Sequence, residues 1–214
     1  MSHPDGSFPV VVLASGRGTN LVALIDRLHS DASSPVTITR VVVSAADAPA
    51  VTAARSAGIA TEVVDREHYS SREERDRALA DVVEAAGPEL VVLAGWMSIL
   101  TPDFLDRFPD RVINLHPSML PAFPGMHAIE EALEWGVRYT GVTVHYADPV
   151  VDGGPPILQE PVLVSTDDSV ESLRERIREV EHRILPQAVA LFAAGRVSRD
   201  PAKRRRVVIQ DGGS

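Results

Sequence analysis

Residues Pro9-Val-Val-Val-Leu-Ala14, followed directly by Ser15-Gly-Arg-Gly-Thr-Asn20, decide the fold class of this chain. The first six residues form a short β-branched run, which is typical of a strand. The two glycines then allow a tight turn. Helical spacing of apolar residues follows at Leu21, Leu24, Ile25 and Leu28. The stretch therefore predicts a strand, a glycine turn and a helix.

The same alternation of strand and helix continues beyond this unit. Further strands are predicted at Thr37–Ser44, Thr61–Asp65, Leu90–Trp96 and Arg111–His116. Helices are predicted at Ala48–Ala57, ended by Gly58, and from Ser70 to Ala86, with Ser70 and Glu73 at capping-box spacing. Such alternation implies right-handed βαβ crossovers. The expected fold is α/β and Rossmann-like, with a mostly parallel twisted sheet and helices on both faces.

The last third of the sequence has a different pattern. Two late strands, expected to be antiparallel, are predicted at Gly141–Ala147 and Ile157–Val164, on either side of a Pro/Gly-rich loop. A long helix should begin near Asp168, and Pro186 should kink or interrupt it. We expect a single domain over residues 1–214, with short exposed or disordered tails at 1–7 and about 203–214.

Composition limits the classes of protein to which the chain can belong. Its 214 residues contain 21 Lys+Arg and 30 Asp+Glu, a formal net charge of −9, and no cysteine. The acidic balance argues against nucleic-acid and membrane-surface partners. The longest apolar runs are far short of the ~20 residues of a membrane helix, and no secretory signal is visible. We therefore expect a cytoplasmic protein, and the spacing of its seven histidines implies no metal site.

The glycine turn is a candidate phosphate site. Free N–H groups at the start of a helix favour an anion, and the glycines let a phosphate approach the backbone. A dinucleotide fingerprint fails because Leu21 takes the place of the third glycine and no acidic residue ends the second strand near Ser44. A Walker A loop fails because no Gly-Lys-Ser/Thr follows. A tight turn without a ligand is an equally good interpretation of this segment alone.

Polar residues at the end of the fifth strand and in two later segments are candidates for chemistry. Asn114 and His116 are two residues apart on a strand, so both point to the same face, at the strand end where α/β sheets bind ligands. An amide and an imidazole can stabilise a developing oxyanion and move a proton. The Asp152-Gly-Gly-Pro loop could bring a carboxylate over His116. Glu181 borders the apolar stripe of the last helix, where it needs a cationic ligand or an ion-pair partner.

Together these pieces resemble the folate-dependent formyltransferases over nearly the whole chain, from Val10 to about Gly195. The specific signals are Asn114-Leu-His-Pro-Ser118 and Asp152-Gly-Gly-Pro155, supported by Ala14–Asn20, Val92–Met97 and Leu120–His127. Within the family, the chain is most similar to members that formylate 5'-phosphoribosylglycinamide (GAR). We expect neither the tRNA-binding extension nor the N-terminal regulatory domain of the other branches.

The resemblance implies the roles of individual residues. The catalytic residues would be Asn114, His116 and Asp152. Residues expected to bind the GAR phosphate and amine are Gly16, Arg17, Gly18, Thr19, Asn20, Arg72 and Glu181. Residues expected to bind 10-formyltetrahydrofolate, the co-substrate, are Met97, Ser98, Ile99, Leu100, Ala147, Asp148, Val150 and Val151.

Two positions depart from the family pattern. Trp96 replaces a phenylalanine and Ser98 replaces an arginine, which removes a charge that could contact the folate tail.

The resemblance implies two small-molecule partners, GAR and the folate, and a homodimer is left open. Two other functions also stay open: hydrolysis of formyltetrahydrofolate or formylation of another amine, and a non-catalytic α/β module that binds a phosphorylated ligand.

Overall fold

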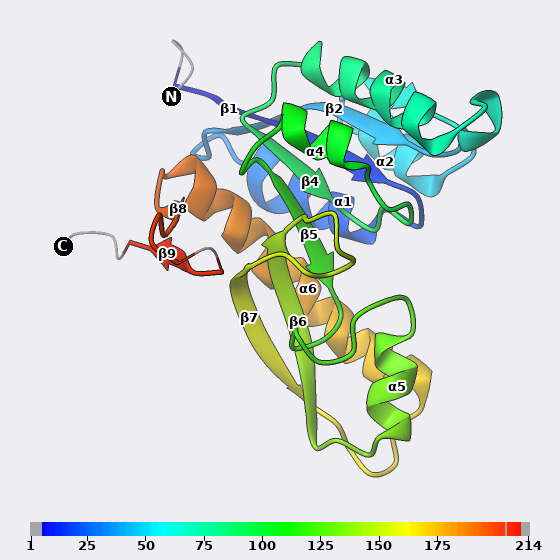
Figure 1. The fold of residues 1–214 in the computed structure, drawn as a ribbon, viewed down its shortest axis with the longest axis vertical. Helices are drawn as coiled ribbons and strands as arrows, with labels where there is room; N and C mark the ends of the chain where they lie inside the picture. Colours follow the sequence, from blue (N-terminus) through cyan, green and yellow to red (C-terminus); the bar gives the residue numbers. More distant parts are fainter. Residues whose placement is uncertain (1–5, 204, 211–214) are drawn as a thin grey trace. The chain divides into compact units, whose positions relative to one another are not determined.

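The structure is a computed structural model that describes residues 6–203 and 205–210 (Figure 1). The order of strands in its large sheet is β3-β2-β1-β4-β5-β6-β7. The chain divides into two compact units, residues 1–113 and 114–214, and strand β5 (Val112–His116) contains the division. The expected α/β class, with a mostly parallel sheet and a late antiparallel pair, is confirmed.

The first unit is built on parallel strands. Its elements are β1 (Phe8–Ala14), α1 (Thr19–Leu24), the π-helix η1 (Ile25–His29), β2 (Val36–Val43), α2 (Pro49–Ser56), β3 (Thr61–Val63), the 3-10 helix η2 (Arg66–His68), α3 (Arg72–Glu84), β4 (Leu90–Leu93) and α4 (Pro102–Arg107). β1 pairs in parallel with both β2 and β4, and β2 pairs in parallel with β3. Every residue of β1 after Phe8 and every residue of β4 is buried, which explains why these strands lack polar alternation.

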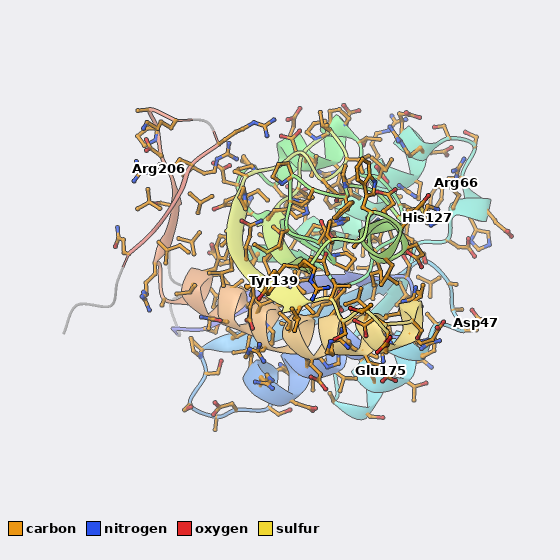
Figure 2. The ribbon with its side chains drawn as sticks, turned by 90° about the horizontal axis from the view of Figure 1, so that it is seen from below. Asp47, Arg66, His127, Tyr139, Glu175 and Arg206 are labelled. Atoms are coloured by element: carbon orange, nitrogen blue, oxygen red, sulfur yellow. The ribbon has the colours of Figure 1, made fainter. Side chains whose placement is uncertain are left out.

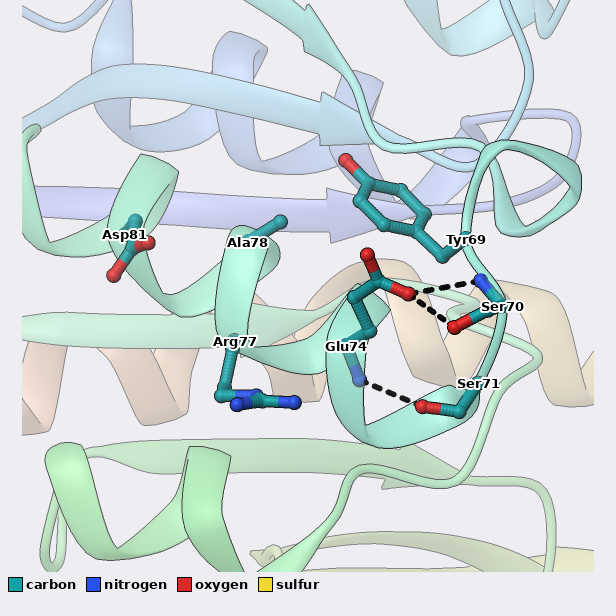
Figure 3. Close-up of a pocket in the computed structure, with 7 residues that line it drawn as sticks. All are labelled: Tyr69, Ser70, Ser71, Glu74, Arg77, Ala78 and Asp81. Atoms are coloured by element: carbon teal, nitrogen blue, oxygen red, sulfur yellow. Dashed lines mark hydrogen bonds between the residues drawn. The ribbon is translucent and has the colours of Figure 1, made fainter.

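Two boundaries in this unit differ from the prediction. Strand β4 ends at Leu93 rather than Trp96, because the chain turns at Gly95, where φ is +79°. Helix α3 is capped by Ser71 rather than Ser70: the Ser71 hydroxyl accepts a hydrogen bond from the Glu74 amide at 3.1 Å. Ser70 instead donates its own amide and hydroxyl to the Glu74 carboxylate, and these bonds hold the pKa of Glu74 below its ordinary value (Figure 3).

The second unit consists of a hairpin, a long helix and a short terminal ladder. Its elements are α5 (Ala128–Glu134), β6 (Tyr139–Tyr146), β7 (Pro156–Leu163), α6 (Val170–Ala193), β8 (Val197–Arg199) and β9 (Val207–Ile209). β6 and β7 pair antiparallel, and α6 packs against both of them (Figure 1). Exposed side chains such as Tyr139 and Glu175 lie on the outside of this unit (Figure 2).

The end of the chain departs from the sequence-based expectation in two ways. Helix α6 continues through Pro186, because burial of Pro186 and its neighbours Leu185 and Ala188 outweighs the backbone hydrogen bond that proline removes. Residues 207–209 form β9, which pairs antiparallel with β8, so part of the expected tail is an ordered ladder. Of the two expected tails, residues 1–5, 204 and 211–214 lie outside the described residues.

A capping box closes the start of α6. The Ser169 hydroxyl accepts a bond from the Ser172 amide at 3.2 Å, and the Ser172 hydroxyl accepts one from the Ser169 amide at 3.0 Å. The cap is thus one residue beyond the predicted Asp168. That carboxylate instead binds Arg176, which holds the pKa of Asp168 far below its ordinary value.

Replacing the cap should cost stability without changing the fold. We expect Ser169→Ala to lower the free energy of unfolding by about 1 kcal/mol, since it leaves a helix N–H without its side-chain acceptor. The measurement is urea denaturation followed by circular dichroism. Glu175→Ala, at an exposed position of the same helix, is the control and should change stability by less than about 0.5 kcal/mol. Equal losses in the two variants would show that the cap contributes nothing.

Candidate active site

A single carboxylate, Asp152, lies between two histidines in the second unit. Its Oδ2 is 3.3 Å from Nδ1 of His116, and its Oδ1 is 3.7 Å from Nε2 of His145. The Gly125 amide donates a hydrogen bond to Oδ2 at 2.8 Å. The side chains of His116, His145 and Asp152 are only 5%, 2% and 9% exposed. This is a nearly dry cluster in which the charges interact more strongly than they would in water.

The local backbone explains how the carboxylate reaches this position. Asp152 lies in the loop between β6 and β7 and has a φ of +51°, which is unusual for a residue other than glycine. Gly154 follows it, and a Cβ at that position would lie 1.7 Å from the carbonyl oxygen of Tyr146. Only glycine lets the loop pass so close to the end of β6. The Asp-Gly-Gly sequence thus fixes where the Asp152 side chain points.

His145 is held as a neutral imidazole. Its Nδ1 donates to the carbonyl of Tyr146 at 2.9 Å, and its Nε2 accepts from Nδ2 of Asn114 at 3.2 Å. Burial lowers the pKa of His145 below its ordinary value of 6.5, against the opposing effects of the Tyr146 carbonyl and the Asp152 charge. A neutral ring with its proton on Nδ1 satisfies both of these hydrogen bonds.

His116 faces acceptors on both of its ring nitrogens. Nε2 is 2.7 Å from the carbonyl oxygen of Phe123, and Nδ1 faces the Asp152 carboxylate. When the ring carries two protons, each N–H therefore has an acceptor. The cluster places a histidine suited to bear positive charge and a histidine suited to stay neutral around the same acid.

The amide of Asn114 completes the group. A carboxamide has two N–H donors, and the bond to His145 uses one of them. The second can be directed at a ligand oxygen. Asn114, His116 and Asp152, which the sequence analysis selected, are therefore brought together within one unit. In chemical terms, the cluster offers a hydrogen-bond donor and a positive charge for a developing oxyanion, and a carboxylate that can accept a proton.

Sequence reasoning missed His145. Its signal was present: a histidine near the end of a predicted strand, Gly141–Ala147, whose other residues are mostly apolar. A buried polar residue at such a position needs partners, and those partners are the Asn114 amide and the Tyr146 carbonyl. The sequence gives no indication of the Gly125 amide or the Phe123 carbonyl, because both are backbone groups.

The predicted phosphate loop belongs to the first unit. Gly18 is the residue before α1 and has a φ of +74°, and a Cβ there would lie 2.9 Å from Cα of Ala50 in α2. Glycine is required at this position for both reasons. Gly16 and Arg17 are exposed, whereas Thr19 and Asn20 are partly buried. The loop presents its backbone to solvent beside a helix start.

The predicted folate segments expose apolar side chains. In the first unit, Met97 is 61% and Ile99 48% exposed, while Leu100 is buried and Ser98 lies between. In the second unit, Val150 is 67% and Val151 47% exposed. Exposed apolar groups in loops are typical of ligand-binding surfaces.

The remaining predicted site residues are distributed over both units. Ala147 and Asp148 are partly buried, and Asp148 accepts a hydrogen bond from the Val150 amide at 3.0 Å. Arg72 is the first residue of α3, in the first unit. Glu181 lies on α6, in the same unit as the histidine cluster, and is partly buried.

The described residues, 6–203 and 205–210, contain neither a candidate metal site nor a membrane-spanning helix. Within them, no group of three or more His, Cys, Asp or Glu side chains could hold a metal ion. No helix in this part of the chain is long and apolar enough to cross a membrane.

The buried His145 should make stability depend on pH. Because its pKa is lower in the folded chain than in the unfolded one, the unfolded state binds more protons once the pH falls below about 6.5. The wild type should therefore lose stability between pH 7 and pH 5, and His145→Asn should not lose this contribution. We expect the difference in unfolding free energy between wild type and variant to shrink over that range. A constant or growing difference, measured by urea denaturation, would contradict a neutral His145.

Comparison with known proteins identifies the family. The sequence profile described as "Formyl transferase" matches residues 9–189. Phosphoribosylglycinamide formyltransferase of Escherichia coli (strain K12) is 41% identical over 188 residues, which cover 88% of this chain and 88% of that protein. The trifunctional purine biosynthetic protein adenosine-3 of Gallus gallus is 45% identical over 188 residues, but this chain spans only 19% of its length.

The fold of this chain is also similar to that of a solved structure. The crystal structure of glycinamide ribonucleotide transformylase 1 from Symbiobacterium toebii is similar to this chain with a TM-score of 0.89 and 44% sequence identity. The match covers 96% of this chain and 95% of that one. The likeness therefore extends over both sequence and fold, and the chain belongs to the formyl transferase family.

Proposed function

We propose that this chain transfers the formyl group of 10-formyltetrahydrofolate to the amine of GAR, giving N-formyl-GAR in de novo purine biosynthesis. The observation that carries the proposal is the cluster of Asn114, His116, His145 and Asp152, in a chain whose relatives are named for this reaction. Residues 1–214 would act as one formyltransferase domain, because the family match runs from residue 9 to 189 across both units.

Asn114 and His116 would stabilise charge on the formyl oxygen. The amine of GAR attacks the formyl carbon, and the carbonyl oxygen becomes an oxyanion. Asn114 donates its free N–H to this oxygen, while His145 keeps the amide oriented. Positive charge on His116, stabilised by Asp152, lowers the energy of the same oxyanion.

Asp152 would move the proton. The attacking nitrogen must lose a proton when it forms its bond to carbon, and N10 of the folate must gain one when its own bond to carbon breaks. Asp152 accepts the first proton, directly or through a water, and returns it to N10, so the carboxylate is unchanged at the end of the reaction. The Gly125 amide and the His116 imidazole hold the carboxylate during this transfer.

Binding of the two substrates would involve the other predicted residues. Gly16–Asn20 and Arg72 would hold the GAR phosphate, and Glu181 its glycinamide amine. The segments 97–100 and 147–151 would hold the folate ring, largely through backbone groups. The partners are small molecules. We expect the enzyme in the cytoplasm, and the homodimer left open by the sequence can be checked by analytical ultracentrifugation.

The decisive assay mixes the purified chain with a 10-formyl folate analogue, with and without GAR, and follows deformylation spectrophotometrically. The proposal predicts turnover that depends on GAR. Equal turnover without GAR would mean a hydrolase, turnover only with another amine would mean a different acceptor, and binding without turnover would mean a non-catalytic module.

Two substitutions test the catalytic cluster. Asn114→Ala and Asp152→Asn should each lower kcat by at least about 10²–10³, since each removes a group that acts mainly in the transition state, and should leave the circular dichroism spectrum unchanged. A folded Asp152→Asn enzyme with wild-type kcat would remove the carboxylate from the mechanism.

Glu181 should affect one substrate only. Glu181→Ala should raise KM for GAR more than KM for the folate, because a contact with the glycinamide amine serves only that substrate. The check is steady-state kinetics with each substrate varied in turn. Equal increases in the two KM values would assign Glu181 a structural role.

A further inference from the structure

Helix α3 carries two adjacent charged residues that are almost completely buried. The side chains of Arg75 and Asp76 are 2% and 0% exposed. Nε of Arg75 donates to Oδ1 of Asp76 at 2.8 Å, and Nη2 binds the same oxygen. Burying two charges costs free energy that their attraction does not reliably recover, so such a pair is weak evidence for a role in stability. Its other contacts indicate what the pair does.

Arg75 also contacts the predicted folate segment 97–100, and Asp76 contacts Thr101, the residue that follows it. Oδ2 of Asp76 accepts a hydrogen bond from the Thr101 amide at 2.7 Å, and Nη2 of Arg75 is 3.4 Å from the Ile99 carbonyl oxygen. The Thr101 bond is short and buried, whereas the Ile99 contact is at the long limit. Asp76 is therefore the main anchor for the end of this segment.

The beginning of the segment is anchored separately. The Met97 amide donates to Oγ of Ser15 at 3.2 Å, and the Ser15 amide donates to the carbonyl oxygen of Gly95 at 3.2 Å. Between the two anchors, the side chains of Met97 and Ile99 are 61% and 48% exposed. The backbone is thus fixed at both ends while the apolar side chains stay free to meet a ligand.

We propose that Asp76 is a positioning residue for the folate: its carboxylate holds the Thr101 amide and so fixes the backbone of residues 97–100 in the shape that binds the pterin ring. Arg75 is the counter-ion that allows the carboxylate to be buried. This inference rests on the proposed function, because that proposal assigns the segment to the folate. What matters for binding is the hydrogen-bond acceptor at position 76, and the charge is dispensable.

A matched pair of double variants separates the acceptor from the charge. R75M/D76N removes both charges but keeps a side-chain oxygen that can accept from the Thr101 amide. R75M/D76L removes both charges and the acceptor with a side chain of similar size. Neither variant leaves an unpaired buried charge, which is the usual reason that one-sided changes of such a pair unfold a protein.

The readouts are KM for the 10-formyl folate analogue, KM for GAR, and the Kd of the analogue by titration calorimetry. For R75M/D76L we expect KM and Kd for the folate analogue to rise on the order of 10-fold, since a displaced binding segment costs much of its affinity. KM for GAR should stay within about 2-fold of the wild type, and R75M/D76N should stay within about 3-fold for both substrates.

Two results would overturn the inference: wild-type folate KM in a folded R75M/D76L, or equal increases in the two KM values, which is the pattern of a general structural role. If circular dichroism shows that R75M/D76L does not fold, R75M/D76A replaces it, because alanine also removes the acceptor and its smaller side chain fits in the space of the aspartate. The same rise in folate KM is expected of that variant, and its absence counts equally against the inference.

The wild type, assayed in parallel, distinguishes the two proposals. A wild type that transfers formyl groups to GAR while R75M/D76L keeps its folate KM contradicts only the role of Asp76. A wild type that binds the analogue without transferring its formyl group contradicts the proposed function, and the Kd values then still decide whether Asp76 positions the segment. A wild type that does not bind the analogue overturns both.

Discussion

The contact of one carboxylate with two imidazoles is the interaction on which the proposed catalytic site depends. Asp152 is close to both His116 and His145, and the low exposure of all three side chains strengthens the interaction of its charge with the two rings. The pairing gives the two histidines different tasks. His116 can carry charge because both of its N–H groups would have acceptors, whereas buried His145 stays neutral and orients the amide of Asn114.

Backbone geometry makes this contact possible. The chain can place Asp152 there only because Gly154 passes against the Tyr146 carbonyl and Asp152 itself adopts a positive φ. A strained residue close to a glycine required by close packing is a typical feature of functional loops. The first unit uses the same means at Gly18, whose missing side chain lets the turn before α1 approach α2. In both places a glycine allows the backbone to bring a functional segment to its position.

Much of this could be predicted from the sequence, and the rest has physical reasons for being hidden. Strands β1, β2 and β5 and the buried stripe from Leu21 to Leu28 follow from local apolar patterns. Asn114, His116 and Asp152 could be proposed as catalytic residues because their motifs are specific. Helices α4 and α5 are too short to show a clear period, and β8 and β9 are formed by only three residues each. His145, the Gly125 amide and the Asp76 anchor depend on contacts between distant residues, which no local pattern reveals.

The protonation of the two histidines tests the central claim most directly. Nitrogen-15 NMR of the imidazole rings distinguishes a neutral ring with its proton on Nδ1 from one protonated on Nε2 or on both nitrogens. We predict that at pH 7 the His145 ring is neutral with its proton on Nδ1, and that its titration midpoint lies below 6.5. A His145 ring that carries both protons at pH 7, or whose proton is on Nε2, could not accept the Asn114 amide and would contradict this account of the site.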